Sequence, residues 1–579
     1  MRASPSADDA CSASPPSFHA SRGHGAHRLY TAHARLHHRC FGALPSRRSG
    51  DGRTTARATL EGTTLKLSEL LAGQNHHIRQ GDPEKALITA GTAFDADRVV
   101  PGSLFIAVPG HLEGGPGAVA PALARGAAAV VVEDGCVVPT AAGDVCVVQV
   151  PDARRTAAVA ASRYFGEPGR RMDMVAITGT NGKTSVSYMV ESALRISEGA
   201  RAGVIGTAGS RIGDELIPMP RSVLSTPESP DLQYLLGYMR DRGVGTVVLE
   251  ATSMGLLTHR IDRTFIDVGV FTNLSQDHLD DHGTMENYRD AKLRLFQGLC
   301  EHAVVNADDP VGARIGAMMP GAVTTYALDA EADFRATDLT ADASGTRFTL
   351  HHQGRKYPAA IPTPGRFSVS NALAAMAACH TLGHDLAGLV SALGRMPQIP
   401  GRFERLTTVG GTSVIVDYAH SPDSLEKVLG AVRGFARSAV VTVFGCGGDR
   451  DTTKRTDMGR IAGTHSDLVV LTSDNPRTED PEVIMDQVVP GIEATGTPYE
   501  RFTDRRTAIE FALSAAGPDD IVLIAGKGSE PYQIVGDVLL PFSDVATVRD
   551  LADIRVAATR SSPAPAKVFP SPTGLPPQR

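Results

Sequence analysis

One short segment limits the fold of this chain more than any other. The strand-like run Met174–Ile177 is followed by TGTNGKTS at 178–185 and then by a helical stretch. Glycines in such a loop let backbone N–H groups surround a phosphate, and the helix N-terminus adds a positive dipole. Lys183 would contact the β- and γ-phosphates, and the Thr184 hydroxyl would bind Mg²⁺. The common phosphate loop has a glycine where this chain has Ile177, so this loop is a shorter variant. The segment predicts an ATP-binding α/β domain whose contacts are Gly179, Thr180, Asn181, Gly182, Lys183, Thr184 and Ser185.

Apolar runs of strand length alternate with helix-length stretches along most of the chain. This alternation predicts a doubly wound, mostly parallel sheet in the centre, with smaller α/β units on either side. We expect a disordered leader, three folded domains and a disordered tail, at 1–64, 65–168, 169–398, 399–558 and 559–579.

The composition excludes several classes of protein. The 579 residues carry a net charge of −7, so no overall positive field would attract nucleic acid. No run of eighteen apolar residues is present, which argues against a membrane-spanning helix. The seven cysteines include no CxxC pair, which disfavours a disulfide scaffold or a zinc cluster and fits a reducing compartment.

The first sixty residues differ from the rest. They contain nine arginines, no lysine, and only Asp8, Asp9 and Asp51 as acidic residues. Two interpretations remain open: an organelle transit peptide, or a misassigned start or plain tail. If the leader is a transit peptide, the protein is in the plastid stroma. Otherwise it is cytoplasmic, which is the location that we expect.

Two further residues are candidate metal ligands. Glu250 ends the apolar strand of VVLEATSMG, and His278 lies just beyond the strand VGVF, in TNLSQDHLDDHG. Ligands collect at the carboxyl ends of parallel strands, and Mg²⁺ prefers oxygen donors there. We therefore expect Glu250 and His278 beside Thr184 at a magnesium site.

Eight segments carry a family resemblance. In chain order they are TGTNGKTS, TNLSQDHLDDHGTMENYRDAKLRLF, NADDP, PGRFERL, VDYAHSPDSL, GCGGDRDTTKR, SDNPRTEDP and AGKGSEPYQ. Together they resemble the Mur ligases, and among these the ligases that add diaminopimelate. The resemblance covers roughly residues 66–556. It implies a three-domain fold, with a small N-terminal α/β domain that binds a UDP-sugar, a central P-loop domain and a Rossmann-like C-terminal domain.

The resemblance also implies the reaction. ATP would convert the terminal carboxylate of UDP-MurNAc-L-Ala-D-Glu to an acyl phosphate, which diaminopimelate then attacks. The reaction would require ATP and Mg²⁺. By the same resemblance we expect a monomer. Lys292, in the block YRDAKLRLF, would be carbamylated and become a further magnesium ligand. Asn371 would contact the nucleotide, and Arg402 its phosphates. Asp417 and His420 would line the junction with the third domain.

Amino-acid choice rests on the third domain. Diaminopimelate differs from lysine by one distal carboxylate, which a planar guanidinium matches with two hydrogen bonds. By resemblance Arg477 supplies that group and Glu530 holds the distal ammonium. The amino-acid contacts so implied are Arg450, Asp474, Asn475, Pro476, Arg477, Gly526 and Glu530. Contacts with the sugar peptide would come from Ser225, Thr226, Ser253 and Arg260.

The sequence departs from the family pattern in the uridine region. A usual Asp-Ser-Arg segment reads Asp95-Ala96-Asp97, and a usual GHxxDG segment reads GHLEGG. Met254, Thr258 and Ser529 also replace residues that are common in the family. Besides the diaminopimelate ligase, two alternatives stay open: a related ligase with another carboxylate acceptor, and a non-catalytic plastid homologue within a transcription complex. The intact Lys183, Lys292 and Arg477 argue against the latter.

Overall fold

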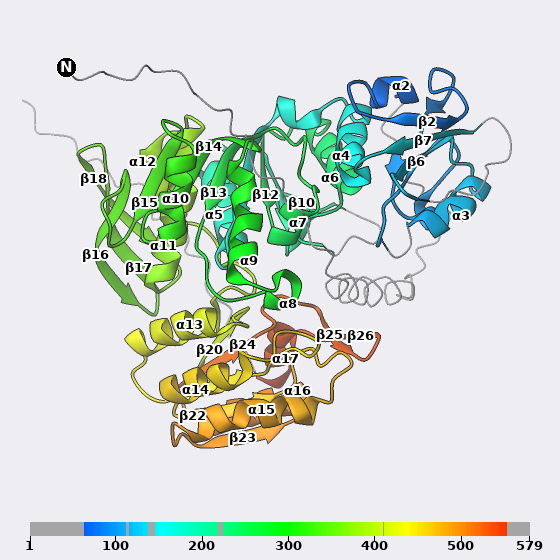
Figure 1. Cartoon of the computed structure of the whole chain (residues 1–579). Helices are drawn as coiled ribbons and strands as arrows, with labels where there is room; N and C mark the ends of the chain where they lie inside the picture. The colour runs from blue at the N-terminus through cyan, green and yellow to red at the C-terminus, as the bar shows by residue number, and fades with distance from the viewer. Residues whose placement is uncertain (1–62, 112–114, 137–144, 218–223, 409, 553–579) are drawn as a thin grey trace, which may run out of the picture.

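The computed structural model describes residues 63–111, 115–136, 145–217, 224–408 and 410–552. Most of the predicted leader, the predicted tail and three residues of the GHLEGG segment lie outside these ranges. Three main β-sheets, of five, eleven and six strands, follow one another along the chain (Figure 1). The predicted mixed α/β fold is confirmed.

The N-terminal sheet has the strand order β2-β7-β6-β5-β4, and only β2 runs antiparallel to its neighbour. Its strands β6 and β7 are almost continuously apolar and buried, as parallel strands covered on both faces are. Helix α4 packs on one face and α3 on the other. The elements are β1 (Leu65–Lys66), α2 (Leu67–Leu70), β2 (His77–Gln80), β3 (Leu87–Ile88), β4 (Thr92–Ala93), β5 (Leu104–Ala107), α3 (Val119–Ala124), β6 (Ala129–Glu133), β7 (Cys146–Val150) and α4 (Ala153–Tyr164).

The central sheet has a parallel core from β9 to β16, in the order β9-β12-β8-β13-β14-β15-β16. Antiparallel strands extend it on both sides: β10 and β11 at one edge, β17 and β18 at the other. The strands are β8 (Asp173–Thr178), β9 (Ala202–Gly206), β10 (Gly209–Ile212), β11 (Glu215–Leu216), β12 (Thr246–Glu250), β13 (Ile266–Phe271), β14 (Cys300–Asn306), β15 (Val323–Ala327), β16 (Phe334–Asp342), β17 (Gly345–His352) and β18 (Arg355–Ile361).

Helices cover both faces of the central sheet. Along β8, Val175 and Ile177 pack against α5, α11 and α12, whereas Met174 and Ala176 face α6. This alternation follows from the two-residue period of a strand and requires a helical layer on each side. The helices are α5 (Lys183–Glu198), α6 (Ser229–Arg240), α7 (Ser253–Leu257), α8 (Leu279–His282), α9 (Met285–Leu293), α10 (Pro310–Met318), α11 (Arg366–Thr381) and α12 (Leu386–Leu393).

The C-terminal sheet has the order β19-β20-β24-β21-β22-β23 and is parallel except for β19. Helices α13, α14 and α15 cover one face, and α16 and α17 the other. The elements are β19 (Glu404–Thr407), β20 (Ser413–Asp417), α13 (Pro422–Phe435), β21 (Val440–Phe444), α14 (Arg455–His465), β22 (Leu468–Thr472), α15 (Pro481–Glu493), β23 (Tyr499–Phe502), α16 (Arg505–Ala515), β24 (Ile521–Ala525), β25 (Tyr532–Val535), β26 (Val538–Pro541) and α17 (Asp544–Leu551).

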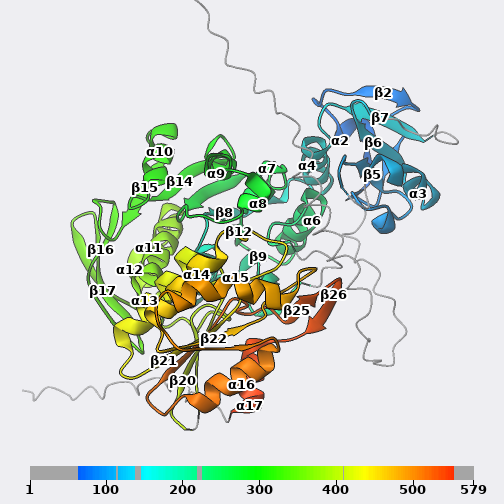
Figure 2. The same ribbon diagram turned by 60° about the horizontal axis from the view of Figure 1, so that its bottom comes forward.

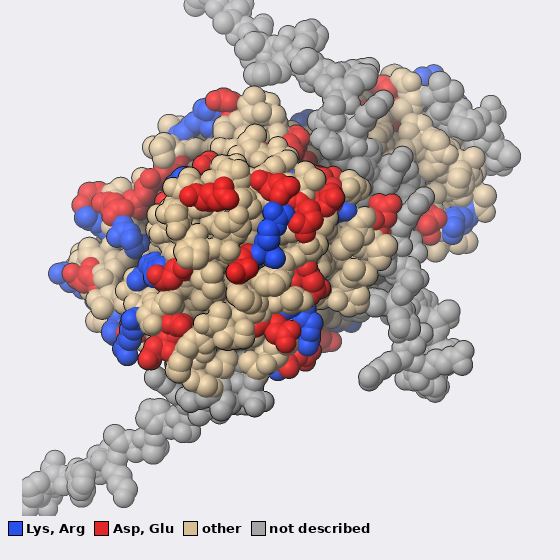
Figure 3. All heavy atoms as spheres, turned by 90° about the horizontal axis from the view of Figure 1, so that it is seen from below, with Lys and Arg blue, Asp and Glu red and all other residues tan. Residues whose placement is uncertain are grey.

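The C-terminal part packs against the end of the central part from which the phosphate loop emerges (Figures 1 and 2). Strands β8 and β12 end at Thr178 and Glu250, and β20 of the other part ends at Asp417. Residues that follow these strand ends line one shared cavity. On the face seen from below, acidic and basic described side chains are interspersed (Figure 3). Within the described ranges, no helix is both long and apolar enough to cross a membrane.

Candidate ATP and amino-acid site

The phosphate loop connects β8 to α5, as the sequence predicts. Helix α5 begins at Lys183, inside the TGTNGKTS segment. Gly182 adopts a left-handed conformation with φ of 92°, and a Cβ there would lie 2.5 Å from the Asn371 side-chain oxygen. Only glycine therefore allows this turn and lets Asn371 lie directly against the loop.

A cavity of about 540 Å³ lies between the central and C-terminal parts. This volume is in the range of small-molecule and cofactor sites. The cavity collects most of the predicted nucleotide and metal residues, from both sides of the interface. Those that line it are Thr180, Asn181, Gly182, Lys183, Thr184, Ser185, Ser225, Glu250, His278, Asn371, Arg402, Asp417 and His420.

Lys183 and Arg402 place two positive charges at this cavity. The Lys183 ammonium donates to the carbonyl oxygens of Gly179 and Thr180, both at 2.9 Å. Burial lowers the pKa of Lys183, against the opposing charges of Glu250 and Asp277. The Arg402 guanidinium comes from the C-terminal part and donates to the Thr184 hydroxyl at 3.1 Å. The arrangement can stabilise negative charge that develops on a transferred phosphoryl group.

Two of the candidate metal ligands, Glu250 and His278, line this cavity. Glu250 is 1% exposed, and its carboxylate accepts hydrogen bonds from the Thr207 N–H and hydroxyl. The His278 ring lies 3.6 Å from the Asp281 carboxylate. Ligand atoms of His278, Asp280 and Asp281 lie within 4.8 Å of one another. Carboxylate oxygens are the donors that Mg²⁺ prefers, and Thr184 lines the same cavity as Glu250.

Lys292 lies behind the phosphate loop rather than on the cavity wall. Its side chain is 1% exposed, and its Nζ donates to the Gly179 carbonyl at 2.9 Å. The Tyr288 ring centroid lies 4.2 Å from that nitrogen. Burial, together with the neighbouring Lys183 charge, lowers the pKa of Lys292 well below its usual range. Burial thus shifts Lys292 toward the neutral amine, the form that can act as a nucleophile.

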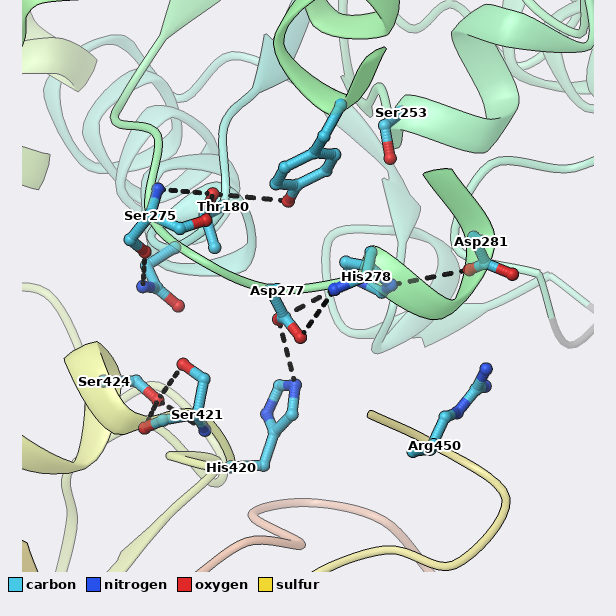
Figure 4. A network of polar contacts seen from close by, with 12 residues as sticks. Thr180, Ser253, Ser275, Asp277, His278, Asp281, His420, Ser421, Ser424 and Arg450 are labelled. Carbon is cyan, nitrogen blue, oxygen red and sulfur yellow. Dashed lines mark hydrogen bonds and ion pairs between the residues drawn. The ribbon is translucent and has the colours of Figure 1, made fainter. Parts of the chain in front are cut away.

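Asp277 connects the two parts of the chain across the cavity. Its carboxylate lies 3.7 Å from His420 (Figure 4) and 3.8 Å from Lys454, both in the C-terminal part. Burial alone would raise the pKa of Asp277. The hydrogen bond from His420 and the nearby His278 and Lys454 charges instead lower it well below the usual value. The sequence reasoning did not single out Asp277 or Lys454, although Asp277 immediately precedes His278 in a quoted segment.

The predicted amino-acid residues form a second cluster, at the carboxyl ends of β21, β22 and β24. Arg477 adopts a left-handed φ of 52°, and its Nη1 donates to the Gly448 carbonyl at 2.6 Å. Its Nε is buried without a hydrogen-bond partner. Burial and the neighbouring Arg450 charge lower the pKa of Arg477. Within the described residues, no carboxylate forms an ion pair with Arg477, so the guanidinium can receive one from a ligand.

Glu530 is more constrained than the sequence indicates. Its carboxylate accepts hydrogen bonds from Lys527 at 2.9 Å, Asn475 at 3.0 Å and Tyr418 at 3.4 Å. Lys527 is fully buried and was not among the predicted site residues, although it lies in the quoted AGKGSE segment. Arg450 extends toward the central part and lies 3.1 Å from Asp280.

The predicted sugar-peptide residues surround the amino end of α7. Thr226 donates to the Glu250 carbonyl at 2.7 Å, and Ser253 lies 2.9 Å from the buried His282 ring. Ser225 lines the cavity, whereas Arg260 is only 3% exposed and lies behind it. Arg260 donates to the Thr226 carbonyl, and its guanidinium lies 3.2 Å from Glu228.

Glu228 also joins the central part to the N-terminal part. Arg154 of α4 donates to it at 2.8 Å. Burial would raise the pKa of Glu228, but Arg260 and Arg154 together lower it to about 2. The altered segments of the N-terminal part lie beside this group: Asp95 and His111 are 3.3 Å apart, and burial lowers the pKa of His111.

Comparison with known proteins places this geometry in a family. Residues 177–379 match the Mur ligase middle domain, and residues 401–528 match the Mur ligase glutamate ligase domain. The chain belongs to the Mur ligase family. It is 40% identical over 488 residues to the UDP-N-acetylmuramoyl-L-alanyl-D-glutamate--2,6-diaminopimelate ligase of Caldanaerobacter subterraneus, covering 84% of this chain and 99% of that one. The corresponding Geobacillus thermodenitrificans ligase is 41% identical over 479 residues, covering 81% and 95%.

A solved structure of a ligase with the same name as these relatives superposes with a TM-score of 0.61 at 34% identity, covering 84% of this chain and 99% of that one. As a Mur ligase the chain is an ATP-dependent ligase, and the predicted Mur ligase architecture is confirmed.

Proposed function

We propose that this Mur ligase joins diaminopimelate to UDP-MurNAc-L-Ala-D-Glu at the expense of ATP, in the synthesis of peptidoglycan precursors. The observation that carries the proposal is the Arg477 guanidinium, which has a buried Nε without a partner and no ion-paired carboxylate among the described residues. An amino acid with a second, distal carboxylate would complete it. Full-length similarity to ligases of that name supports the same substrates.

The first step is phosphoryl transfer. The glutamate carboxylate oxygen attacks the γ-phosphorus of ATP, the bond to the ADP oxygen breaks, and an acyl phosphate forms. Lys183 of the central part and Arg402 of the C-terminal part, which both line the cavity, stabilise charge on the transferred group. The amine of diaminopimelate then attacks the acyl carbon, phosphate leaves with the bonding electron pair, and the nitrogen loses a proton. Bound Mg²⁺ would neutralise phosphate charge.

The magnesium ligands we propose are Thr184, Glu250, His278 and a carbamate on Lys292. Carbamate formation needs a neutral amine, because the nitrogen lone pair attacks the carbon of CO₂ and a proton is then released. The lowered pKa of Lys292 favours that neutral amine. The product is a carboxylate-like oxygen donor, which suits a hard cation.

Two residues would recognise the distal end of the amino acid. We propose that Arg477 binds the distal carboxylate, and that Glu530 binds the distal ammonium from a position fixed by Lys527 and Asn475. Arg450, Asp474, Pro476 and Gly526 would complete the pocket.

We further propose that the folded domains divide near residues 168 and 398, and that the enzyme acts as a monomer in the cytoplasm. The five described cysteines are all free, which supports a reducing compartment.

A related ligase activity on another carboxylate acceptor is the second candidate function. It is favoured by the altered uridine segments, where Asp95 faces His111 instead of presenting the usual Asp-Ser-Arg side chains. The phosphate and amino-acid sites would then work on a different nucleotide or peptide.

Phosphate release tests both functions. Release that requires ATP, UDP-MurNAc-L-Ala-D-Glu and diaminopimelate together supports the first function. Release with diaminopimelate and another acceptor alone favours the second. No release with any acceptor, from protein that still binds ATP, contradicts both and supports a non-catalytic role.

A further inference from the structure

The hairpin of β25 and β26 contacts the amino-acid loop through its backbone. The Arg477 N–H donates to the Ile534 carbonyl at 3.1 Å, and the Gly536 N–H donates to the Arg477 carbonyl at 2.7 Å. Arg477 and Val535 accordingly form a parallel β-bridge. Both backbone groups of Arg477 are therefore bonded to β25 and the turn that follows it, about sixty positions later in the sequence.

The same strand binds the residues that precede Arg477. The Ile534 N–H donates to the Asn475 side-chain oxygen at 3.0 Å. The Gln533 amide donates to the Asp474 carbonyl at 2.7 Å. The whole Asp474–Arg477 loop thus lies along β25, which fixes it at three of its four residues.

This support matters because Arg477 is in an unfavourable backbone conformation. Its φ of 52° lies in the left-handed region, where residues other than glycine are uncommon. Released from the hairpin, the backbone would return to a right-handed or extended conformation. The guanidinium would then leave the Gly448 carbonyl and point away from the amino-acid cluster.

The hairpin itself has little packing of its own. Ile534 is buried, but Val535, Val538 and Leu540 are 42%, 55% and 45% exposed. Two-stranded hairpins are marginal in water without further contacts. The connecting turn depends on Gly536, which has a φ of 56° and open space where a Cβ would be. A substitution at Gly536 would therefore act through the turn conformation rather than through a clash.

We propose that β25 is a positioning strand that determines specificity for the distal carboxylate, because it holds Arg477 in the conformation that presents the guanidinium. The inference rests on the proposed function for its choice of substrate. The residues that carry it, Gln533 and Gly536, bond to the loop itself, at the carbonyls of Asp474 and Arg477.

Two substitutions at one position test the proposal. Gly536→Val places a β-branched residue where φ is positive, and Gly536→Asn places a residue that tolerates this region. We expect Gly536→Val to raise the KM for diaminopimelate about 10- to 100-fold, as the loss of one or two hydrogen bonds would, with the KM for ATP unchanged. Gly536→Asn should restore most of the affinity. Leu540→Ser, on the exposed face of the same hairpin, is the matched control and should behave as the unaltered chain.

Discrimination between diaminopimelate and lysine separates positioning from general damage. In Gly536→Val the ratio of the two kcat/KM values should fall with the affinity. An unchanged ratio, or a lower kcat with the KM for diaminopimelate intact, would overturn the proposal.

Amide hydrogen exchange of the 474–477 segment gives a readout that does not depend on the substrate. The Arg477 amide should be protected in the unaltered chain and in Gly536→Asn, and should exchange faster in Gly536→Val. Equal protection in all three proteins would overturn the positioning role. If the unaltered chain releases no phosphate with diaminopimelate, the proposed function fails together with the specificity role, and exchange still decides whether β25 holds the loop.

Discussion

Replacing Arg477 by methionine removes the guanidinium while keeping much of its apolar length. In the structure, Nη1 of this guanidinium donates to the Gly448 carbonyl, and Nε is buried without a hydrogen-bond partner. The positive charge of Arg450 lies nearby. A distal carboxylate would receive the remaining donors. Truncating one partner of a buried charge pair costs about 2–5 kcal/mol. At about 1.4 kcal/mol per tenfold, kcat/KM for diaminopimelate should fall roughly 30- to 4,000-fold.

The assay is phosphate release with saturating ATP and acceptor, with diaminopimelate and lysine titrated separately. Lysine has no distal carboxylate, so Arg477→Met should leave its kcat/KM unchanged or improve it. Arg477→Lys is the charge-matched control: it keeps a cation but loses the planar pair of donors, and its loss should be intermediate. If Arg477→Met kept the ratio of diaminopimelate to lysine turnover of the unaltered chain, the role assigned to this guanidinium would be refuted.

Two other predictions concern buried titratable groups. Lys292→Ala should lower kcat at least about 100-fold by removing a metal ligand, and added short-chain carboxylates should restore part of the activity. Native mass spectrometry of the unaltered chain should detect the carbamate. A Lys292→Ala variant with undiminished kcat would rule the carbamate out as a metal ligand. Burial lowers the pKa of His282 to about 4. As pH falls from about 6.5 to 4, His282 becomes protonated in the unfolded chain but not in the folded chain. The free energy of unfolding should therefore fall by up to about 3 kcal/mol. Denaturant unfolding across this range should show a smaller pH dependence in His282→Gln, which retains a polar group toward Ser253; identical slopes would contradict the assignment.

The sequence predicted those features that depend on neighbours in the chain. The phosphate loop is local: a strand, a glycine turn and a helix fix its shape, so its residues lie at the cavity as expected. Glu250 and His278 line the same cavity, because the ends of parallel strands meet at one sheet edge; their role as metal ligands stays a prediction.

Features that depend on distant partners were missed. The bond from Lys527 to Asn475, 52 residues earlier in the chain, needs the fully buried position of Lys527, which no pattern in AGKGSE indicates. The ion pairs of Asp277 with His420 and Lys454 join residues that are more than a hundred positions apart in the sequence. The antiparallel strands β17 and β18 were also absent from the expected parallel sheet, because their half-exposed alternation leaves only a weak apolar pattern.

The phosphate loop exchanges hydrogen bonds directly with the C-terminal part: Asn181 donates to Asp423 at 2.8 Å, and Arg402 donates to Thr184. The affinity for ATP and the docking of the C-terminal part on the central part are therefore thermodynamically linked. Thermodynamic reciprocity requires that if ATP favours docking by some factor, docking favours ATP by the same factor. A substitution at Asp423, on the first turn of α13, should consequently change the affinity for ATP although this residue lies outside the central part.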